Sequence, residues 1–364
     1  MYKLDIILII VLFLVGCGRP PLDTPAENRL VADSLINEHL DSVYKFANRF
    51  PNNTQIAVGL IQNGKPYFYG VIRYNDTLFT TQNSDSAFEI GSLTKVFTAT
   101  ILANYVVNGE INPDNKINPV FQFQFNNNIQ FSYKELANHT SGLPRLPSNL
   151  RFTAIFNQDN PYKGYDHQKF DKYLKNNMKL NYPKGSKSEY SNLGMGLLSY
   201  TLQKYSGKNF EELLNAFVFS KYQMFNSSTV KSNVSDILVV GQNAKGEPTS
   251  NWASGALIGA GGIYSTVSDL SKFAIAQFDS ANKELALTRV KTFKETDTRD
   301  VGLGWFIIHR KNGDQWYWHN GGTGGYTSSM VIDVENKNGI IILTNLSGQA
   351  KLLGDKNKIF ILAQ

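Results

Sequence analysis

The stretch FEIGSLTK, residues 88–95, decides how this sequence is interpreted. Residues 87–90 (AFEI) predict a short strand, Gly91 predicts a turn, and the mainly apolar run over 96–102 predicts a helix. This order places Ser92 at a helix N-terminus, with Lys95 one turn later on the same face. A serine and a lysine in this arrangement suit a nucleophile and the group that activates it.

The Ser-x-x-Lys pattern by itself is not selective. It occurs four times, beginning at Ser42, Ser92, Ser228 and Ser280. Only Ser92 follows a predicted strand and a glycine turn and precedes a strongly apolar helix. The other three are interpreted as residues of surface helices or loops.

Two further motifs follow in order, YSN at 190–192 and HNG at 319–321. Of the 18 tyrosines, Tyr190 alone has an asparagine two positions later. Patterns similar to HNG occur at 311–313 and 337–339, but these lie between apolar strands and predict hairpin turns. The motif at 319 instead ends a predicted strand and continues into glycines, which let a ligand or another backbone come close.

The order of the predicted elements indicates one α/β (α+β) domain. A helix over 30–43 and a hairpin over 55–72 precede a mainly helical stretch, and strands over 303–310, 314–320, 327–335 and 339–345 close the chain. Capping boxes predict helix starts at Ser132 and Thr266. Strands from both ends of the sequence suggest one antiparallel sheet flanked by helices, with an inserted helical lobe at about 100–250.

The chain resembles the serine β-lactamase and penicillin-binding protein superfamily. It is most similar to the branch of class C β-lactamases, D-aminopeptidases, D,D-carboxypeptidases and related esterases. The resemblance rests on the three motifs together with FEIGS at 88–92, NHTSGLP at 138–144, YSNLG at 190–194 and GGIYST at 261–266. It covers roughly residues 26–346 and implies the β-lactamase/transpeptidase-like fold, with the catalytic cleft between sheet and lobe. It also implies a C-terminal helix, for which only interrupted apolar residues at 352–360 are present.

The chemistry that this resemblance implies is an acyl-enzyme on Ser92. A serine hydroxyl needs a neighbouring base, and a lysine with an ordinary pKa of ~10.4 must be buried or placed near positive charge to serve as one. Lys95 is therefore either the base itself or a cation that lowers the pKa of Tyr190; the resemblance implies that the two act together. Asn192 is expected to bind the substrate amide.

The third motif is expected to complete the substrate site. The backbone N–H groups of Ser92 and Gly322 are the expected oxyanion donors, and Gly321 belongs to the same strand end. His319 departs from typical β-lactamases and penicillin-binding proteins, which have lysine there. A histidine with pKa ~6.5 is mostly neutral at pH 7, so this residue weakens the case for an efficient β-lactamase and suits aminopeptidase- and esterase-like relatives.

The N-terminus predicts export. Residues 1–16 contain a short apolar segment after Lys3 and read as a signal peptide. The segment ends in LVGC at 14–17, which resembles a bacterial lipobox, and Cys17 is the only cysteine. We expect lipidation of Cys17, a tether over 17–25, a hydrolase domain over 26–364 and attachment to the membrane in the cell envelope. An ordinary signal peptide with an incidental cysteine is the alternative.

Composition excludes few partners but favours some over others. The net charge is +6 in 364 residues, without a block of like charge that would mark a nucleic-acid-binding tail. We therefore expect no nucleic-acid partner. No His/Cys/Asp cluster has metal-ligand spacing, so we expect neither metal nor organic cofactor.

Rival interpretations remain for each motif. Ser92 could be only a helix cap, and His319 could pack among neighbouring aromatic residues; the order and context of the motifs favour the functional interpretation. His139 is expected to be structural, Glu189 to face solvent, and Ser254 lacks the Gly-x-Ser-x-Gly pattern.

The expected function is an envelope serine hydrolase acting on a small ester, a short D-peptide such as a cell-wall fragment, or, least favoured, a β-lactam. A non-catalytic peptidoglycan-binding lipoprotein and a structural lipoprotein are the alternatives from other classes.

Overall fold

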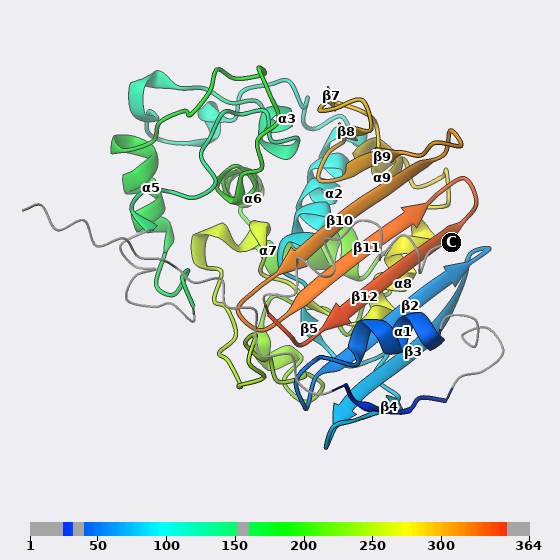
Figure 1. Cartoon of the computed structure of the whole chain (residues 1–364). Helices are drawn as coiled ribbons and strands as arrows, with labels where there is room; N and C mark the ends of the chain where they lie inside the picture. Colours follow the sequence, from blue (N-terminus) through cyan, green and yellow to red (C-terminus); the bar gives the residue numbers. More distant parts are fainter. Residues whose placement is uncertain (1–24, 32–39, 151–159, 348–364) are drawn as a thin grey trace, which may run out of the picture.

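The computed structural model describes residues 25–31, 40–150 and 160–347, and its centre is a ten-stranded sheet (Figure 1). All neighbouring strands are antiparallel except β1 and β4, which are parallel. The fold is thus the expected mixed α/β fold around a mainly antiparallel sheet. In spatial order the strands are β1 (Glu27–Arg29), β4 (Thr77–Thr81), β3 (Lys65–Tyr74), β2 (Gln55–Gln62), β12 (Asn338–Thr344), β11 (Thr327–Asp333), β10 (Gln315–Gly322), β9 (Phe306–His309), β8 (Arg299–Val301) and β7 (Phe293–Lys294).

The two ends of the sequence meet inside this sheet, as predicted. Strand β2 pairs with β12, so that Ala57 lies opposite Leu343. The predicted hairpin of β2 and β3 is closed by Asn63 and Gly64, both with positive φ (51° and 76°). Two such residues form the turn whose twist matches that of the flanking strands.

One predicted helix is wrong at its start. The expected helix over 30–43 is preceded by β1, whose residues pair in parallel register with Thr77–Phe79 of β4. Leu30 and Val31, where the helix was expected to begin, are not helical, and helix α1 is described over Leu40–Ala47. The unpaired edge of β4 offers hydrogen bonds to the arriving chain, and an extended segment can use them whereas a helix cannot.

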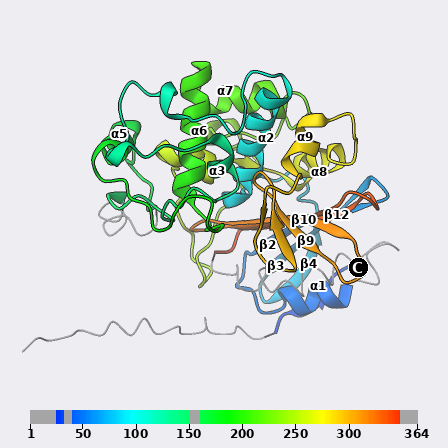
Figure 2. The ribbon, with the colours of Figure 1, turned by 90° about the horizontal axis from the view of Figure 1, so that it is seen from above.

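The sheet has a helix-covered face on each side (Figure 2). Along β12, Ile341 and Leu343 belong to the core cluster shared with α2 (Thr94–Val107) and α8 (Val267–Ala276), whereas Ile340 and Ile342 belong to the cluster shared with α1. This alternation follows from the two-residue period of a strand. It explains why residues 340–343 of β12 are all apolar.

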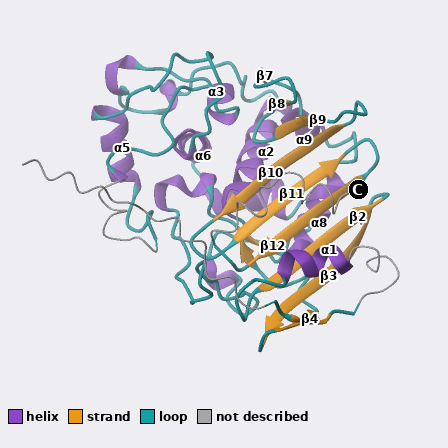
Figure 3. Ribbon diagram, in the orientation of Figure 1, coloured by secondary structure: helices purple, strands orange, loops and turns teal. Residues whose placement is uncertain are grey.

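The remaining helices gather mainly at one side of the sheet (Figure 3). Helices α2 and α6 are buried over most of their length and pack within the main core. A separate two-stranded sheet, β5 (Phe88–Glu89) with β6 (Tyr264–Ser265), leads into α2. The other α-helices are α3 (Tyr133–Ala137), α5 (His167–Asn176), α6 (Asn192–Ser206), α7 (Phe210–Leu214) and α9 (Lys283–Thr288).

Short helical turns connect these elements. The turn before α2 is η2 (Gly91–Leu93), and a π-helical turn, η5 (Asn215–Phe219), follows α7. The other turns are η3 (Asn118–Val120), η4 (Asn126–Asn128), η6 (Lys231–Asn233) and η7 (Gly255–Ala260).

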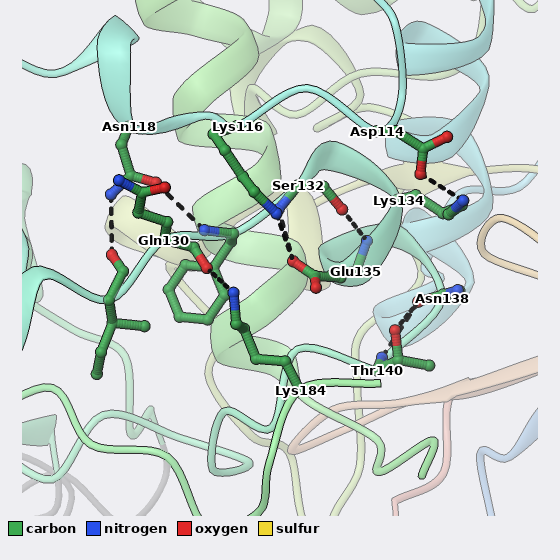
Figure 4. Close-up of polar contacts among 12 residues, drawn as sticks. Asp114, Lys116, Asn118, Gln130, Ser132, Lys134, Glu135, Asn138, Thr140 and Lys184 are labelled. Atoms are coloured by element: carbon green, nitrogen blue, oxygen red, sulfur yellow. Dashed lines mark hydrogen bonds and ion pairs between the residues drawn. The ribbon is translucent and has the colours of Figure 1, made fainter. Parts of the chain in front are cut away.

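Polar contacts hold both ends of α3 (Figure 4). The predicted capping box is confirmed: Ser132 Oγ accepts from the Glu135 N–H, and Glu135 accepts from the Ser132 N–H at 2.7 Å. After the helix, Asn138 Oδ1 accepts hydrogen bonds from the N–H and the hydroxyl of Thr140. These contacts fix the start of the segment 139–145, which borders the site described below.

Several predictions fall on residues outside the described ranges. Cys17, the signal peptide and most of the tether precede residue 25, and the expected C-terminal helix at 352–360 follows residue 347. Within the described part of the chain, no helix is both long enough and apolar enough to cross a membrane.

Candidate active site

Ser92 lies in the turn η2 immediately before α2, as the sequence predicts. Gly91 makes this turn with a φ of +50°, a conformation that glycine adopts without strain. Lys95 lies in the first turn of α2, and its Nζ is 3.0 Å from Ser92 Oγ. The short strand, the glycine turn and the helix together aim both side chains at one point.

Lys95 is completely buried, and its surroundings disfavour a charge. Burial lowers the pKa of Lys95 well below its ordinary value, and the nearby positive charge of Arg145 lowers it further. The Ala260 carbonyl accepts a hydrogen bond from Nζ at 2.7 Å. This bond fixes the amine beside Ser92.

Tyr190 approaches the same point from the start of α6. Its hydroxyl hydrogen-bonds the Ser92 side chain, while burial raises the pKa of Tyr190. Lys95 Nζ lies 4.7 Å from the centroid of the Tyr190 ring. The next residue, Ser191, is the N-cap of α6, since its hydroxyl accepts from the Gly194 N–H at 2.9 Å. The cap explains the middle residue of the YSN motif.

The His139 ring packs against the Tyr190 ring. The two ring centroids are 4.8 Å apart, and His139 Nδ1 accepts from the Ser191 N–H at 3.4 Å. His139 is buried, and burial lowers its pKa well below the ordinary value, so the ring is neutral. This placement agrees with the structural role expected for His139.

Asn192 is the first residue of α6 and is almost fully buried. Its Nδ2 donates to the Tyr162 hydroxyl at 3.2 Å, whereas its Oδ1 has no hydrogen-bond partner among the described residues. The Tyr162 ring in turn lies 5.4 Å from that of Trp252.

A cavity of about 690 Å³ adjoins the site at Trp252. Glu89, the last residue of β5, accepts a hydrogen bond from the Trp252 N–H at 2.8 Å and so fixes the backbone of Trp252 beside the cavity. The cavity is lined among others by Asn251, Trp252, Ser254, Gly262, Tyr264 and Tyr326.

Strand β10 closes the other side of the site. His319, within this strand, is 1% exposed and its Nδ1 lies 2.8 Å from the Asn320 carbonyl. Burial and the neighbouring Lys95 lower the pKa of His319 to about 3, so this ring too is neutral. Its Nε2 is buried without a hydrogen-bond partner in the described part of the chain.

The end of β10 contacts η2 (Gly91–Leu93), called here the catalytic turn, through backbone atoms. A Cβ on Gly321 would stand 2.8 Å from the Ser92 nitrogen and 2.0 Å from the Ile90 carbonyl oxygen. A Cβ on Gly91 would stand 2.7 Å from the Gly322 nitrogen. The two expected oxyanion donors, Ser92 N–H and Gly322 N–H, therefore lie on adjoining backbone segments.

The structure thus brings together every predicted site residue within its described ranges. Three residues that border this centre were not predicted from the sequence: Arg145, Tyr162 and Trp252. Tyr162 and Trp252 stand in no motif of their own. Arg145 directly follows the NHTSGLP segment, a position that could have drawn attention to it.

Other candidates lie elsewhere or play other parts. Glu189 is half-exposed and pairs with Lys187 at 2.9 Å, consistent with the solvent-facing position expected for it. Ser254 lines the cavity rather than approaching Lys95. Among the residues that the structure describes, no group of three or more His, Cys, Asp or Glu could hold a metal ion.

Comparison with known proteins shows the family. The Beta-lactamase family model matches residues 49–363. A β-lactamase from Psychrobacter immobilis is 26% identical over 69% of this chain, which spans 61% of that relative's length. The D-alanyl-D-alanine-carboxypeptidase/endopeptidase AmpH of Escherichia coli is 25% identical over 86% of this chain and 84% of its own.

A solved structure shares the fold. The octameric penicillin-binding protein homologue from Pyrococcus abyssi superposes with a TM-score of 0.72 and 21% identity, over 88% of this chain and 77% of that one. The residues that match the family model make up most of the sequence and include all three motifs. The chain therefore belongs to the Beta-lactamase family of serine-type hydrolases, in its class C-like branch.

Proposed function

We propose that this protein is an envelope serine hydrolase that forms an acyl-enzyme on Ser92 with an ester or peptide substrate. The observation that carries the proposal is the 3.0 Å separation of Ser92 Oγ from the buried Lys95 amine. A neutral amine at that distance can accept the serine proton as the oxygen attacks a carbonyl.

The opposite pKa changes support Lys95, rather than a Tyr190 phenolate, as the base. Burial lowers the pKa of Lys95 and raises that of Tyr190. Both shifts favour the uncharged forms, an amine and a phenol. The phenol can then supply a proton to the leaving group, and the proton taken up by Lys95 restores Tyr190.

The tetrahedral intermediate needs donors for its oxyanion. The Ser92 and Gly322 N–H groups are the proposed pair, because their backbones adjoin and such donors favour the developing charge. When the leaving group departs with its proton, the acyl group stays on Ser92. A water molecule then attacks the ester, and Ser92 regains its proton.

Two unpartnered acceptors suit an amide substrate. Asn192 Oδ1 and His319 Nε2 are buried acceptors without partners among the described residues. A buried polar atom that lacks a hydrogen bond is costly, so a substrate N–H that reaches either atom would bind favourably. This observation favours peptides over simple esters.

Short D-peptides such as cell-wall fragments are the substrates we favour. The relative AmpH is named for D-alanyl-D-alanine peptides, and another relative is a β-lactamase. β-Lactams rank last because His319 is neutral where typical β-lactamases have a lysine. A peptidoglycan-binding lipoprotein without turnover is the alternative. The lipobox-like sequence before Cys17 supports attachment to the envelope membrane.

Labelling with a fluorophosphonate tests the proposal. The nucleophile displaces fluoride and keeps the phosphonyl group, so intact-mass analysis should show one adduct on the parent and none on Ser92→Ala. Ser280→Ala is the matched control: Ser280 is exposed and also begins a Ser-x-x-Lys pattern, and this variant should label like the parent. An unlabelled but folded parent would refute an activated Ser92 and favour the binding protein.

A further inference from the structure

We propose that Arg145 binds a carboxylate on the leaving-group side of the substrate, as carried by the C-terminal residue of a short peptide. This inference rests on the proposed acyl-enzyme function and names the substrate class of that site. The guanidinium of Arg145 is the group that would recognise the anion, because its fork of N–H donors matches the two oxygens of a carboxylate.

The backbone at Arg145 is hydrogen-bonded to the start of α6. The Arg145 carbonyl accepts from the Leu193 N–H at 3.1 Å, and the preceding Pro144 carbonyl accepts from the Ser191 hydroxyl at 2.7 Å. The residues on either side of Asn192 thus hold Arg145 in register with the YSN motif. An arginine placed by the same contacts that place Tyr190 is positioned for recognition rather than left on a free loop.

The side chain of Arg145 is available to a ligand. Arg145 is exposed, and its guanidinium carbon lies 5.1 Å from the centroid of the Tyr190 ring. Within residues 25–31, 40–150 and 160–347, no carboxylate lies within ion-pair distance of it. The acidic residue beside Tyr190, Glu189, is instead paired with Lys187.

Arg145 is also the permanent positive charge of this centre. Burial disfavours the protonated forms of Lys95, His139 and His319, whereas an arginine stays charged in proteins. The position that holds a lysine in typical β-lactamases is thus neutral here. A substrate carboxylate that enters the centre would find its opposite charge at Arg145.

The position of Tyr190 indicates which end of the substrate carries the carboxylate. In the proposed mechanism the Tyr190 phenol protonates the leaving group, so the leaving group must lie beside that hydroxyl. Arg145 stands over the same ring. The C-terminal carboxylate of a departing amino acid lies one carbon from the departing nitrogen and falls within reach of this guanidinium.

A rival role would be purely electrostatic, with Arg145 acting only on Lys95 and Tyr190. That role affects every substrate equally, whereas carboxylate binding affects only substrates that have the carboxylate. A pair of substrates that differ in this group alone therefore separates the two roles.

The experiment uses two thioesters of N-acyl-D-alanine, one with thioglycolate and one with the uncharged thioglycolamide as leaving group. Acylation rates of Ser92 are measured on the full chain with the parent, Arg145→Gln and Arg145→Lys, at a pH where each variant's rate no longer depends on pH. Arg49→Gln is the charge-matched control, because Arg49 is an exposed arginine just after α1, on the opposite face of the sheet.

We expect the parent and Arg49→Gln to prefer the thioglycolate. Arg145→Gln should lose about 10- to 100-fold in kcat/KM for the thioglycolate and far less for the amide, as expected for a charge-assisted pair. Arg145→Lys should fall between the two, since lysine keeps the charge but not the fork. Equal losses on both thioesters, or a parent without preference, would overturn the assignment.

Turnover of peptides separates this inference from the proposed function. If D-alanyl-D-alanine peptides are not hydrolysed while the Arg145-dependent preference persists, the peptidase proposal fails and the carboxylate site stands. β-Lactams also carry a carboxylate next to the leaving nitrogen. Comparing the Arg145→Gln effect on a dipeptide and on benzylpenicillin shows which of the two carboxylate sources the site accepts.

Discussion

Lys95 Nζ lies 4.7 Å from the centroid of the Tyr190 ring, and both side chains also contact Ser92. Burial acts on the two in opposite directions: it lowers the pKa of Lys95 and raises that of Tyr190. Both shifts favour the uncharged forms of the two groups. One buried environment thus suits both the proposed base and the proposed acid, next to the same hydroxyl.

This division of roles predicts that the two residues respond differently to the leaving group. Lys95→Met should slow acylation by about 10²- to 10⁴-fold for all substrates, because it removes the general base. Tyr190→Phe should have that effect on amides but a much smaller one on p-nitrophenyl esters, whose leaving group needs no proton. Stopped-flow acylation rates with matched amide and ester pairs measure it. Equal sensitivity of both substrates to Tyr190→Phe would assign the base role to tyrosine.

The charge of Arg145 predicts the position of the acid limb of the pH–rate profile. Activity requires the neutral amine of Lys95, so acylation falls as pH drops through the lowered pKa of that residue. Arg145 contributes to the lowering, and its removal makes protonation easier. Arg145→Gln should therefore move the acid limb to higher pH, whereas Arg49→Gln should not. The profile of kcat/KM for a neutral ester measures this; an unmoved limb would show that burial alone sets the pKa.

The contact between the catalytic turn and β10 predicts a cost for any side chain at Gly91. Gly91→Ala adds a Cβ 2.7 Å from the Gly322 nitrogen at a φ of +50°. Gly109→Ala meets the same kind of backbone strain at a φ of +76°, but nothing lies within 4 Å of its Cβ. Both variants should lose about 1–2 kcal/mol from the left-handed backbone.

Gly91→Ala should lose a further ~1–3 kcal/mol from the collision and, because the two oxyanion donors are displaced, most of its acylation rate. Thermal unfolding and acylation by a fluorophosphonate measure the two effects. If Gly91→Ala matched Gly109→Ala in both, the close approach of Gly322 would not matter to the site.

The parts of this fold that local patterns determine are the parts that the sequence predicts well. The hairpin at Asn63 and Gly64 and the capping box at Ser132 follow from short-range chemistry, and the structure contains both. The strand β1 could not be predicted in this way, because its partner is β4, about fifty residues later. An edge that accepts an extended chain leaves no local mark on that chain.

The same distinction holds for the site. Ser92, Lys95 and Tyr190 stand in motifs whose spacing is fixed by a helix turn or a cap. Arg145 and Trp252 reach the centre through contacts between distant loops, such as the hydrogen bond from the Trp252 N–H to Glu89. The environment of a residue is also invisible in sequence: His319 has an ordinary pKa near 6.5 in a peptide but about 3 in this strand.

That depressed pKa predicts how stability depends on pH. In the unfolded chain His319 takes up a proton below about pH 6.5, whereas in the folded chain it stays neutral down to about pH 3. Between these values the unfolded state binds more protons, so the folded state loses stability as pH falls. The loss amounts to about 1.4 kcal/mol per pH unit.

His319→Gln removes this term and keeps a polar side chain of similar size. For each protein, the free energy of unfolding is measured by urea unfolding at fixed ionic strength and referred to its own value at pH 8. Between pH 6.5 and 4 the variant should lose less of this free energy than the parent. His139 is also buried, and burial is the main cause of its lowered pKa in both proteins, so most of its contribution cancels from the difference. Parallel stability profiles of the parent and His319→Gln would mean that His319 can be protonated in the folded protein. The centre would then hold a positive charge at His319 besides that of Arg145, and ranking β-lactams last because His319 is neutral would no longer be justified.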